Sequence, residues 1–474
     1  NSFGGTPLWT NGQPSPLYPP RLITSFLMGA PLQHDIFILF HILLGGFGMY
    51  FLCRKMKFQT AGSIIAALFW MFAPMTFAWM QFEFYLPILA LLPWIFYGCV
   101  KLTQLLSDNK LNNVIARIKF VFPTVVLISF LQTMLFLGSN IQFVMFVMVP
   151  VAIYLFFAIF KIGFEKGSNV SKPERNILRR VIDSGFNSAI FSGVIAGITL
   201  LLSATAWLPI AIFASKSNRV DFTYDQFVGP TNIIPKDVFL KNTFWHLPYP
   251  YISTHLFQMT FMGSVAALFA LLGFFNFSKK QRQNKLTYVR ILTVSTMLIV
   301  IGTPLAWFIY SFVPGMHYLT ALGRMLFLWT FALCILAALG ADTIINSASK
   351  FAQQLIRKPS INFVIPVTVV IMLFAFANVY QTSSYGMSIN PPVVERIGDN
   401  IFPETPLIKS LKKNMSADVR IIPISRGDLD WAPPMMYASH QMVYDINSAA
   451  GYESIVDAKT VDTWRLISGE SPET

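Results

Sequence analysis

Ten long runs of apolar residues dominate this chain of 474 residues and limit what it can fold into. They cover residues 36–53, 60–79, 85–100, 120–137, 141–160, 189–213, 256–277, 291–310, 325–346 and 361–380. An α-helix rises about 1.5 Å per residue, so about 20 residues cross the roughly 30 Å hydrocarbon layer of a bilayer. With 54% hydrophobic and 12% charged residues, the chain could not cover the surface of a soluble protein. The runs therefore predict an all-α polytopic membrane protein with about ten transmembrane helices.

Basic residues are concentrated in alternate connections between these runs. Five connections, at 54–57, 101–119, 161–183, 279–290 and 350–358, hold 21 of the 35 Lys and Arg residues, and their net charge is +17 against −4 elsewhere. Because cytoplasmic loops retain positive charge during insertion, these connections are predicted to be cytoplasmic and both chain ends to lie outside. The net charge of +13 thus reflects orientation in the membrane, and we expect no nucleic-acid partner. An outer N-terminus also leads us to expect at least one further helix before residue 1.

The sequence lacks the patterns typical of disulfide frameworks, metal sites and nucleotide-binding or hydrolase motifs. Cys53, Cys99 and Cys334 all fall in or beside apolar runs, so neither a disulfide framework nor a Cys-rich metal site is expected. His246 and His255 lack metal-site spacing. No phosphate-binding GxxxxGK[ST], no GxGxxG, no HExxH and no GxSxG motif occurs. We therefore predict no metal site and no nucleotide cofactor.

Three segments outside the apolar runs are large enough to carry chemistry. Residues 1–35 form a Gly- and Pro-rich first outer loop, and residues 36–380 are the transmembrane domain, which includes an outer loop at 214–255. Residues 381–474 hold 12 of the 22 acidic residues and are predicted to be part of an extracytoplasmic α+β unit. Within it, the pattern favours a helix near 405–414 and strands near 418–424 and 441–446.

Short motifs in a constant order run along nearly the whole chain. They are Phe3-Gly4-Gly5-Thr6-Pro7, Tyr18-Pro19-Pro20, Gly138-Ser139-Asn140-Ile141-Gln142, Leu208-Pro209, Gly302-Thr303-Pro304, Pro314-Gly315, Thr405-Pro406 and Gly451-Tyr452-Glu453-Ser454. Each is weak alone, and Ser139 replaces the usual His of its motif, but their order and spacing resemble the YfhO-type family of bacterial membrane proteins.

That family is similar to the GT-C glycosyltransferases. The resemblance implies a protein of the bacterial cytoplasmic membrane that takes a sugar from a polyprenyl-phosphate donor and attaches it to an outer-face acceptor, a cell-envelope glycopolymer or glycolipid. In the family, the acidic residue expected to act as general base precedes the first of these motifs, so the principal catalytic acid is expected upstream of residue 1. The expected partners are the lipid bilayer, the lipid-linked sugar and the acceptor; the resemblance leaves a divalent-metal requirement open.

Arg324 is the best candidate for stabilising the negative charge that develops on a lipid-phosphate leaving group. It lies at the outer end of the ninth run, where a cation without a partner is unfavourable; the alternative is an interfacial Arg that extends toward water. The family usually has a second Arg where this chain has Thr320. His317 or Arg219 is expected to take that place.

Four further residues are candidates at the outer boundary. Glu83, in a tight turn, is either an auxiliary acid or a solvated carboxylate, and Asp35 is a second weak candidate for the acid. Gln142 starts the fifth run and either binds sugar hydroxyls or caps a hairpin. Tyr18 stacks on a sugar or isoprenoid, or else anchors the chain at the interface.

The sequence therefore predicts a membrane glycosyltransferase, and two alternatives stay open. One is a transporter or flippase for lipid-linked sugars, which would use the same basic and aromatic residues without chemistry. The other is a scaffold subunit of an envelope complex. Transporters commonly contain inverted repeats, and the lack of a convincing internal repeat here favours the enzyme.

Overall fold

The structure of the protein is a computed structural model that describes residues 10, 15–80, 82–107, 114–168, 177–217, 219–220, 222–229, 232–244, 260–276, 280–356, 363–389, 404–415, 444 and 446. The chain divides into two compact units. We call Ser15–Ala204 with Thr223–Pro391 the membrane unit, and Asn1–Pro14, Thr205–Phe222 and Pro392–Thr474 the second unit. Each is described by itself.

Within the described ranges, eight segments are long and apolar enough to cross a membrane. Two of them are α2 (Ala30–Lys55), and α3 (Thr60–Met71) together with α4 (Pro74–Trp79). The others are α5 (Leu86–Ser107), α6 (Val114–Gly138), α7 (Ile141–Ser168), α8 (Ile177–Leu202), α15 (Leu326–Ile356) and α16 (Val364–Ile389). The prediction of a polytopic helical membrane protein is confirmed.

Within the described residues the count is eight spans, or nine if one bent helix pair is taken as a single span, against the predicted number of about ten. In the run at 256–277, α12 (Ser264–Phe274) has 11 residues and a length of about 16 Å, too short to cross the hydrocarbon. The run at 291–310 is divided between α13 (Lys280–Val300) and α14 (Pro304–Phe312), which are bent by 93° and make a ninth span only if taken together. Gly302 has a φ of +73° and the proline begins α14, so hydropathy remains high where the helix breaks.

The predicted span at 189–213 begins and ends too late. The spanning helix is α8, which already starts at Ile177, and a separate helix, α9 (Ala204–Ala214), follows Ser203. Arg179, Arg180 and Asp183 lie within the first turns of α8. A scan for uncharged runs therefore missed the start of the helix, because charged side chains are accommodated where a helix leaves the membrane.

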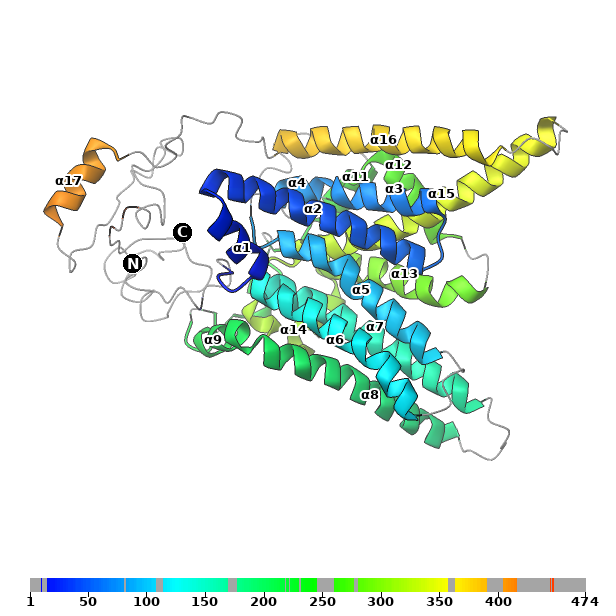
Figure 1. Cartoon of the computed structure of the whole chain (residues 1–474), viewed down its shortest axis with the longest axis horizontal. Helices are drawn as coiled ribbons and strands as arrows, with labels where there is room; N and C mark the ends of the chain where they lie inside the picture. Colours follow the sequence, from blue (N-terminus) through cyan, green and yellow to red (C-terminus); the bar gives the residue numbers. More distant parts are fainter. Residues whose placement is uncertain are drawn as a thin grey trace. The chain divides into compact units, whose positions relative to one another are not determined.

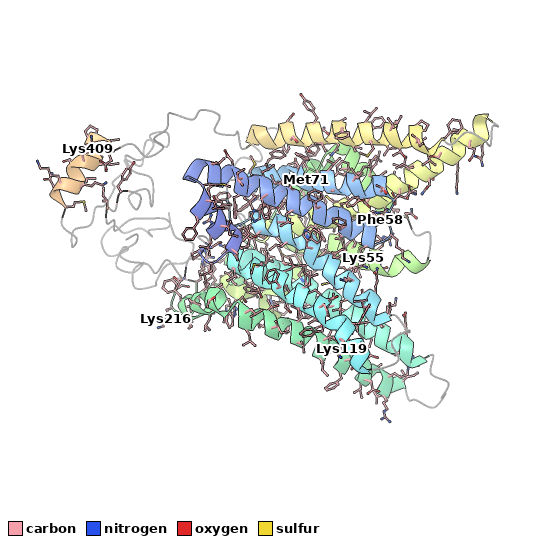
Figure 2. All side chains as sticks on the ribbon, in the orientation of Figure 1. Lys55, Phe58, Met71, Lys119, Lys216 and Lys409 are labelled. Carbon is pink, nitrogen blue, oxygen red and sulfur yellow. The ribbon has the colours of Figure 1, made fainter. Side chains whose placement is uncertain are left out.

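The helix ends that carry the basic connections lie at one end of the membrane unit. Lys55 at the end of α2 and Lys119 near the start of α6 lie toward this end in Figure 2. We name the opposite end, where α1 (Pro19–Leu27), the turn at 82–85 before α5 and the start of α7 lie, the distal end (Figure 1). Thus the structure separates the helix ends next to the basic connections from the candidate site residues described below.

Backbones of α12 and α15 approach each other at two glycines. A Cβ added at Gly273 would lie 1.9 Å from the Leu336 carbonyl oxygen, and one at Gly340 would lie 1.9 Å from the Phe269 carbonyl oxygen. Because lipid gives helices little hydrophobic reason to associate, close contact between small residues is a main source of packing energy in membranes. This pair of contacts therefore fixes the short helix α12 against the longest span.

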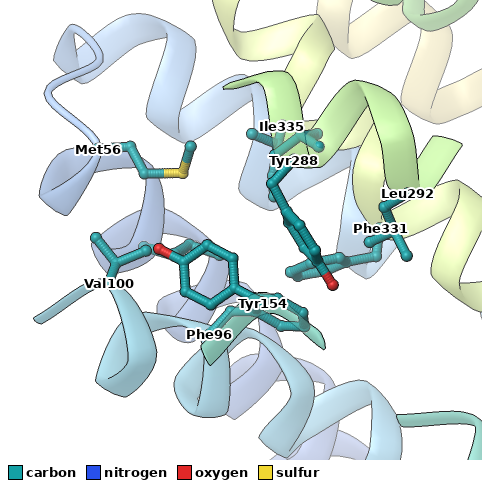
Figure 3. A pocket seen from close by; sticks show the side chains of 10 residues that line it. Met56, Phe96, Val100, Tyr154, Tyr288, Leu292, Phe331 and Ile335 are labelled. Carbon is teal, nitrogen blue, oxygen red and sulfur yellow. The ribbon is translucent and has the colours of Figure 1, made fainter. Parts of the chain in front are cut away.

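A cluster of aromatic side chains is packed inside the membrane unit, in the part nearer the end with the basic connections. The rings of Tyr154 and Tyr288 have centroids 4.8 Å apart, and Phe96 and Phe331 lie beside them (Figure 3). The cavity that these side chains border is about 20 Å³, enough for one water molecule but for no larger ligand. This region is consequently packed core.

The second unit contains the helix predicted near 405–414. It is α17 (Pro406–Asn414), and the side chain of Thr405 caps it by accepting a hydrogen bond from the Ile408 N–H at 3.3 Å. The predicted strand near 418–424 lies outside the described residues. Of the one near 441–446, only residues 444 and 446 are described, and neither is in a strand. The part of the chain with assigned structure is helical.

Candidate functional site

Arg324 and Gln142 meet at the distal end of the membrane unit. The Arg324 Nη1 donates to the Gln142 Oε1 at 2.7 Å, and the guanidinium carbon lies 5.5 Å from the centroid of the Trp79 ring. Gln142 is 5% exposed, and its amide nitrogen donates to the Thr320 carbonyl oxygen. Both ends of the Gln142 amide are thereby used to hold the arginine and its loop. The arrangement fixes a cation beside an aromatic face, a combination suited to an anionic ligand.

The loop that carries Arg324 contains a residue in an unfavourable backbone conformation. It follows the 3₁₀ helix η2 (Met316–Tyr318) and turns at Ala321, whose φ of +54° is in the left-handed region that most residues avoid, before η3 (Leu322–Met325). Asn232 stabilises this turn twice: its Oδ1 accepts from the Ala321 N–H at 2.8 Å and its carbonyl accepts from the Gly323 N–H at 2.9 Å. Asn232 therefore positions the arginine from a distant part of the sequence.

Substituting Asn232 by alanine should loosen this turn selectively. Asn232→Ala removes the side-chain acceptor of the Ala321 N–H but leaves the main-chain acceptor of the Gly323 N–H. Since one hydrogen bond contributes about 1 kcal/mol, we expect hydrogen exchange of the Ala321 amide to accelerate about fivefold. Exchange measured by mass spectrometry over 316–326 checks this, and a segment from α5 is the control. Unchanged exchange at Ala321 would show that the turn is stable without the Asn232 side chain.

Glu83 is held by two partners, although the sequence left a solvated carboxylate open. Arg21 of α1 forms an ion pair with it, and the His34 Nδ1 lies 2.7 Å from its Oε1. The Glu83 side chain is 18% exposed. Burial lowers the pKa of Arg21, and the adjacent carboxylate supplies the opposite charge that a buried cation needs. Glu83 therefore connects α1 and the start of α2 to the turn before α5.

An aromatic cluster lies between these two polar groups. The ring of Trp79 lies under the Arg324 guanidinium. Its centroid is 5.2 Å from that of the Phe82 ring and 6.4 Å from that of the Phe84 ring, and these two phenylalanines are the sequence neighbours of Glu83. The Phe84 carbonyl accepts a hydrogen bond from the Ser139 hydroxyl at 2.7 Å. Glu83 and Arg324 thus belong to one end of the same packed structure.

Tyr18 lies inside the membrane unit. It is 2% exposed, and its hydroxyl lies 2.9 Å from the Nε2 of His41, which is fully buried. The His41 Nδ1 lies 2.7 Å from the Phe37 carbonyl oxygen. A carbonyl only accepts, so Nδ1 carries the proton and Nε2 accepts from the tyrosine. Burial raises the pKa of the Tyr18 hydroxyl, which keeps it a donor. In this position Tyr18 is packed against helices and not presented to the surface.

The remaining sequence candidates are Asp35, His317 and Arg219. Asp35 is exposed on the second turn of α2. His317 is in η2, where its ring centroid lies 4.1 Å from that of Tyr318. Arg219 belongs to the second unit, where its guanidinium lies 5.5 Å from the Phe222 ring. Among residues of described position, no three His, Cys, Asp or Glu side chains gather in a group able to hold a metal ion.

The chain is similar in structure to an archaeal oligosaccharyltransferase. One matching structure, from Archaeoglobus fulgidus, is tethered to an acceptor peptide with the NVT sequon; its TM-score is 0.45 at 12% identity, over 80% of this chain and 47% of the other. A second, of AglB from that organism with an inhibitory peptide and a dolichol-phosphate, has a TM-score of 0.42 at 12% identity, over 80% and 48%. This chain therefore spans about half the length of the proteins it matches. No protein-family model and no curated protein matches it.

Sequence reasoning missed three residues of the site. Arg21 is one of 14 basic residues outside the five basic connections, so its position gave only a general signal. Trp79 belongs to a cluster of aromatic residues around Glu83, and such clusters are common at membrane boundaries. Asn232 gave no signal, because its importance depends on hydrogen bonds to Ala321 and Gly323 across a long sequence separation.

Proposed function

We propose that the protein is a GT-C-like glycosyltransferase of the YfhO type, which transfers a sugar from a polyprenyl-phosphate donor to a cell-envelope acceptor at the outer face of the bacterial cytoplasmic membrane. The observation that carries the proposal is Arg324, held by Gln142 over Trp79 at the distal end of the spans. A cation fixed at the membrane boundary, away from the basic loops, suits the phosphate of a lipid whose tail stays in the bilayer.

The chemistry is a displacement at the anomeric carbon. The acceptor oxygen bonds to that carbon while the bond from the carbon to the phosphate oxygen breaks, and the acceptor proton passes to a carboxylate base. Negative charge grows on the departing phosphate, and the guanidinium of Arg324 stabilises it through charge-assisted hydrogen bonds. Because Gln142 and Trp79 already hold the guanidinium, little reorganisation is needed as the charge develops.

A transfer assay separates this function from transport. Proteoliposomes containing the protein expressed from its whole gene, so that a catalytic acid encoded upstream of residue 1 is present, would receive a radiolabelled polyprenyl-phosphate sugar and an extract of envelope glycolipids, with protein-free liposomes as the control. We expect the label to become covalently attached to acceptor and to be recovered apart from the donor lipid. Label that crosses the bilayer but never becomes attached would overturn the proposal in favour of a flippase.

A further inference from the structure

The indole N–H of Trp79, the last residue of α4, differs from those of two other tryptophans in the membrane unit. Trp79 is 3% exposed, and its Nε1 is buried without a hydrogen-bond partner in the part of the chain that the structure describes. By contrast, the indole nitrogens of Trp70 and Trp94 donate to the carbonyls of Leu89 and Leu44, each at 2.9 Å. A buried donor without an acceptor is unfavourable, and native structures contain few of them. Trp79 therefore keeps a donor that a bound molecule can use.

The described neighbours of Trp79 offer its N–H only weak acceptors. The rings of Phe82, Phe143 and Phe84 have centroids 5.2, 5.4 and 6.4 Å from that of the Trp79 ring. The face of an aromatic ring accepts only a weak hydrogen bond. The guanidinium carbon of Arg324 lies 5.5 Å from the Trp79 centroid, and a guanidinium donates hydrogen bonds but accepts none. A strong acceptor therefore has to come from a ligand.

The indole and the guanidinium together are complementary to an anion with several oxygens. The Arg324 Nη1 donates to the Gln142 Oε1, which fixes the guanidinium beside the indole. A phosphate has enough lone pairs to accept from a guanidinium and from an indole N–H at the same time. The indole adds a hydrogen bond without adding a charge. Among aromatic rings, where the surroundings are less polar than water, such a bond to an anion is strengthened.

Two of the rings around the indole have room to move. Phe82 and Phe84 lie on the turn before α5 and are partly exposed. The turn itself is held in place, because the Phe84 carbonyl accepts from the Ser139 hydroxyl at 2.7 Å and Glu83 pairs with Arg21. A partly exposed side chain changes rotamer much faster than helices rearrange. Rotation of one phenylalanine can thus admit a phosphate to the indole while the turn stays in place.

We propose that Trp79 donates its indole N–H to a phosphate oxygen of the donor lipid, beside the guanidinium of Arg324. The inference rests on the proposed function and adds a second, neutral donor to the phosphate site. The phosphate supplies the acceptor that this N–H lacks among the described residues, so binding relieves an unfavourable feature of the free protein. Trp79 thus binds substrate in addition to supporting the arginine.

Two replacements remove the N–H and keep an aromatic ring under Arg324. One is Trp79→Phe. The other places β-(3-benzothienyl)alanine at position 79, which keeps the size of the indole and has sulfur where the N–H was. Trp70→Phe is the matched control, because Trp70 is 1% exposed and its N–H already donates to Leu89. The probes are a polyprenyl phosphate and the corresponding polyprenol, which lacks the phosphate. Competition against a photoreactive polyprenyl phosphate measures their binding to the protein expressed from its whole gene.

We expect both replacements of Trp79 to weaken the polyprenyl phosphate about tenfold and to leave the polyprenol unchanged, because only the phosphate accepts the N–H. Without ligand, the benzothienyl protein should melt at or above the wild-type temperature, since it loses no hydrogen bond. Trp70→Phe should bind both probes as the wild type does and melt at a lower temperature, because the Leu89 carbonyl loses its donor.

Wild-type affinity of the benzothienyl protein for the polyprenyl phosphate would overturn the proposal, and so would an equal weakening of the polyprenol. A lower melting temperature of that protein would also overturn it, because the N–H would then have an acceptor within the protein. Failure of the proposed function gives a different result: Arg324→Ala would then bind the polyprenyl phosphate as tightly as the wild type. If only the role of Trp79 is wrong, Arg324→Ala still binds it more weakly.

Discussion

Replacing Arg324 by alanine should lower the rate of sugar transfer by about 10²- to 10³-fold, the usual effect of removing one preorganised donor at a developing anion. The substitution removes the cation over Trp79 and leaves the Gln142 Oε1 without the hydrogen bond it now accepts. The loss should fall mainly on the turnover rate, because the charge that Arg324 meets is larger in the transition state than in the bound donor. Initial rates of label transfer in proteoliposomes measure it.

Two further variants make this result specific. Arg324→Lys keeps the charge but lacks the planar fork that serves Gln142 and a phosphate together, so we expect an activity between those of alanine and arginine. Arg180→Ala is the matched control: Arg180 also lies over an aromatic ring, 4.5 Å from Phe164, but toward the basic end of the unit. It should keep full transfer activity. Wild-type rates in Arg324→Ala would remove the arginine from the mechanism.

Alanine at either glycine of the α12 and α15 contact should destabilise the membrane unit strongly. In Gly273→Ala and Gly340→Ala the new methyl group would lie 1.9 Å from a backbone carbonyl oxygen, and a backbone cannot rotate away as a side chain can. The two helices must separate, which forfeits their packing along the contact. We expect about 3 kcal/mol of lost stability, the upper part of the range that overpacking produces. Thermal unfolding in detergent, followed by size-exclusion profile, measures it.

Gly193→Ala gives the control for that experiment. Gly193 is also helical, in α8, but a Cβ added there meets no atom within 4 Å. Alanine favours the helix over glycine by as much as about 1 kcal/mol, so this variant should be unchanged or slightly more stable. A melting temperature for Gly340→Ala as high as that for Gly193→Ala would contradict the close contact between α12 and α15.

Much of the membrane unit follows from local sequence properties. The start of α7 beside Gln142, the position of Glu83 in a short turn and the place of Arg324 just before α15 were all evident in the order of apolar runs. The apolar runs predicted continuous helices through Gly263 and Gly302, but both glycines have positive φ and lie outside the helices. At these two places hydropathy stays high while the backbone leaves the helix, so a count based on apolar length exceeds the number of spans.

The site itself followed from the sequence only in part. Arg324 was a candidate for the phosphate, and Gln142 was expected either to bind sugar hydroxyls or to cap a hairpin, but their mutual hydrogen bond joins residues 182 positions apart. Tyr18 was expected to stack on a sugar or isoprenoid or to anchor the interface, yet it is enclosed with His41. Glu83 was considered without Arg21, because nothing in the order of residues says that α1 folds back onto the turn before α5.

The sequence by itself determined that the chain is a helical membrane protein and that the helix ends next to its basic connections lie together. Both properties arise from transfer free energies that act on each residue or short segment in turn, so a linear reading suffices. Only the tertiary structure decided that Asn232 holds the turn before Arg324, that Trp79 lies under its guanidinium, and that Arg21 pairs with Glu83. These features depend on which helix faces contact one another, and directional hydrogen bonds and close packing set that only in three dimensions.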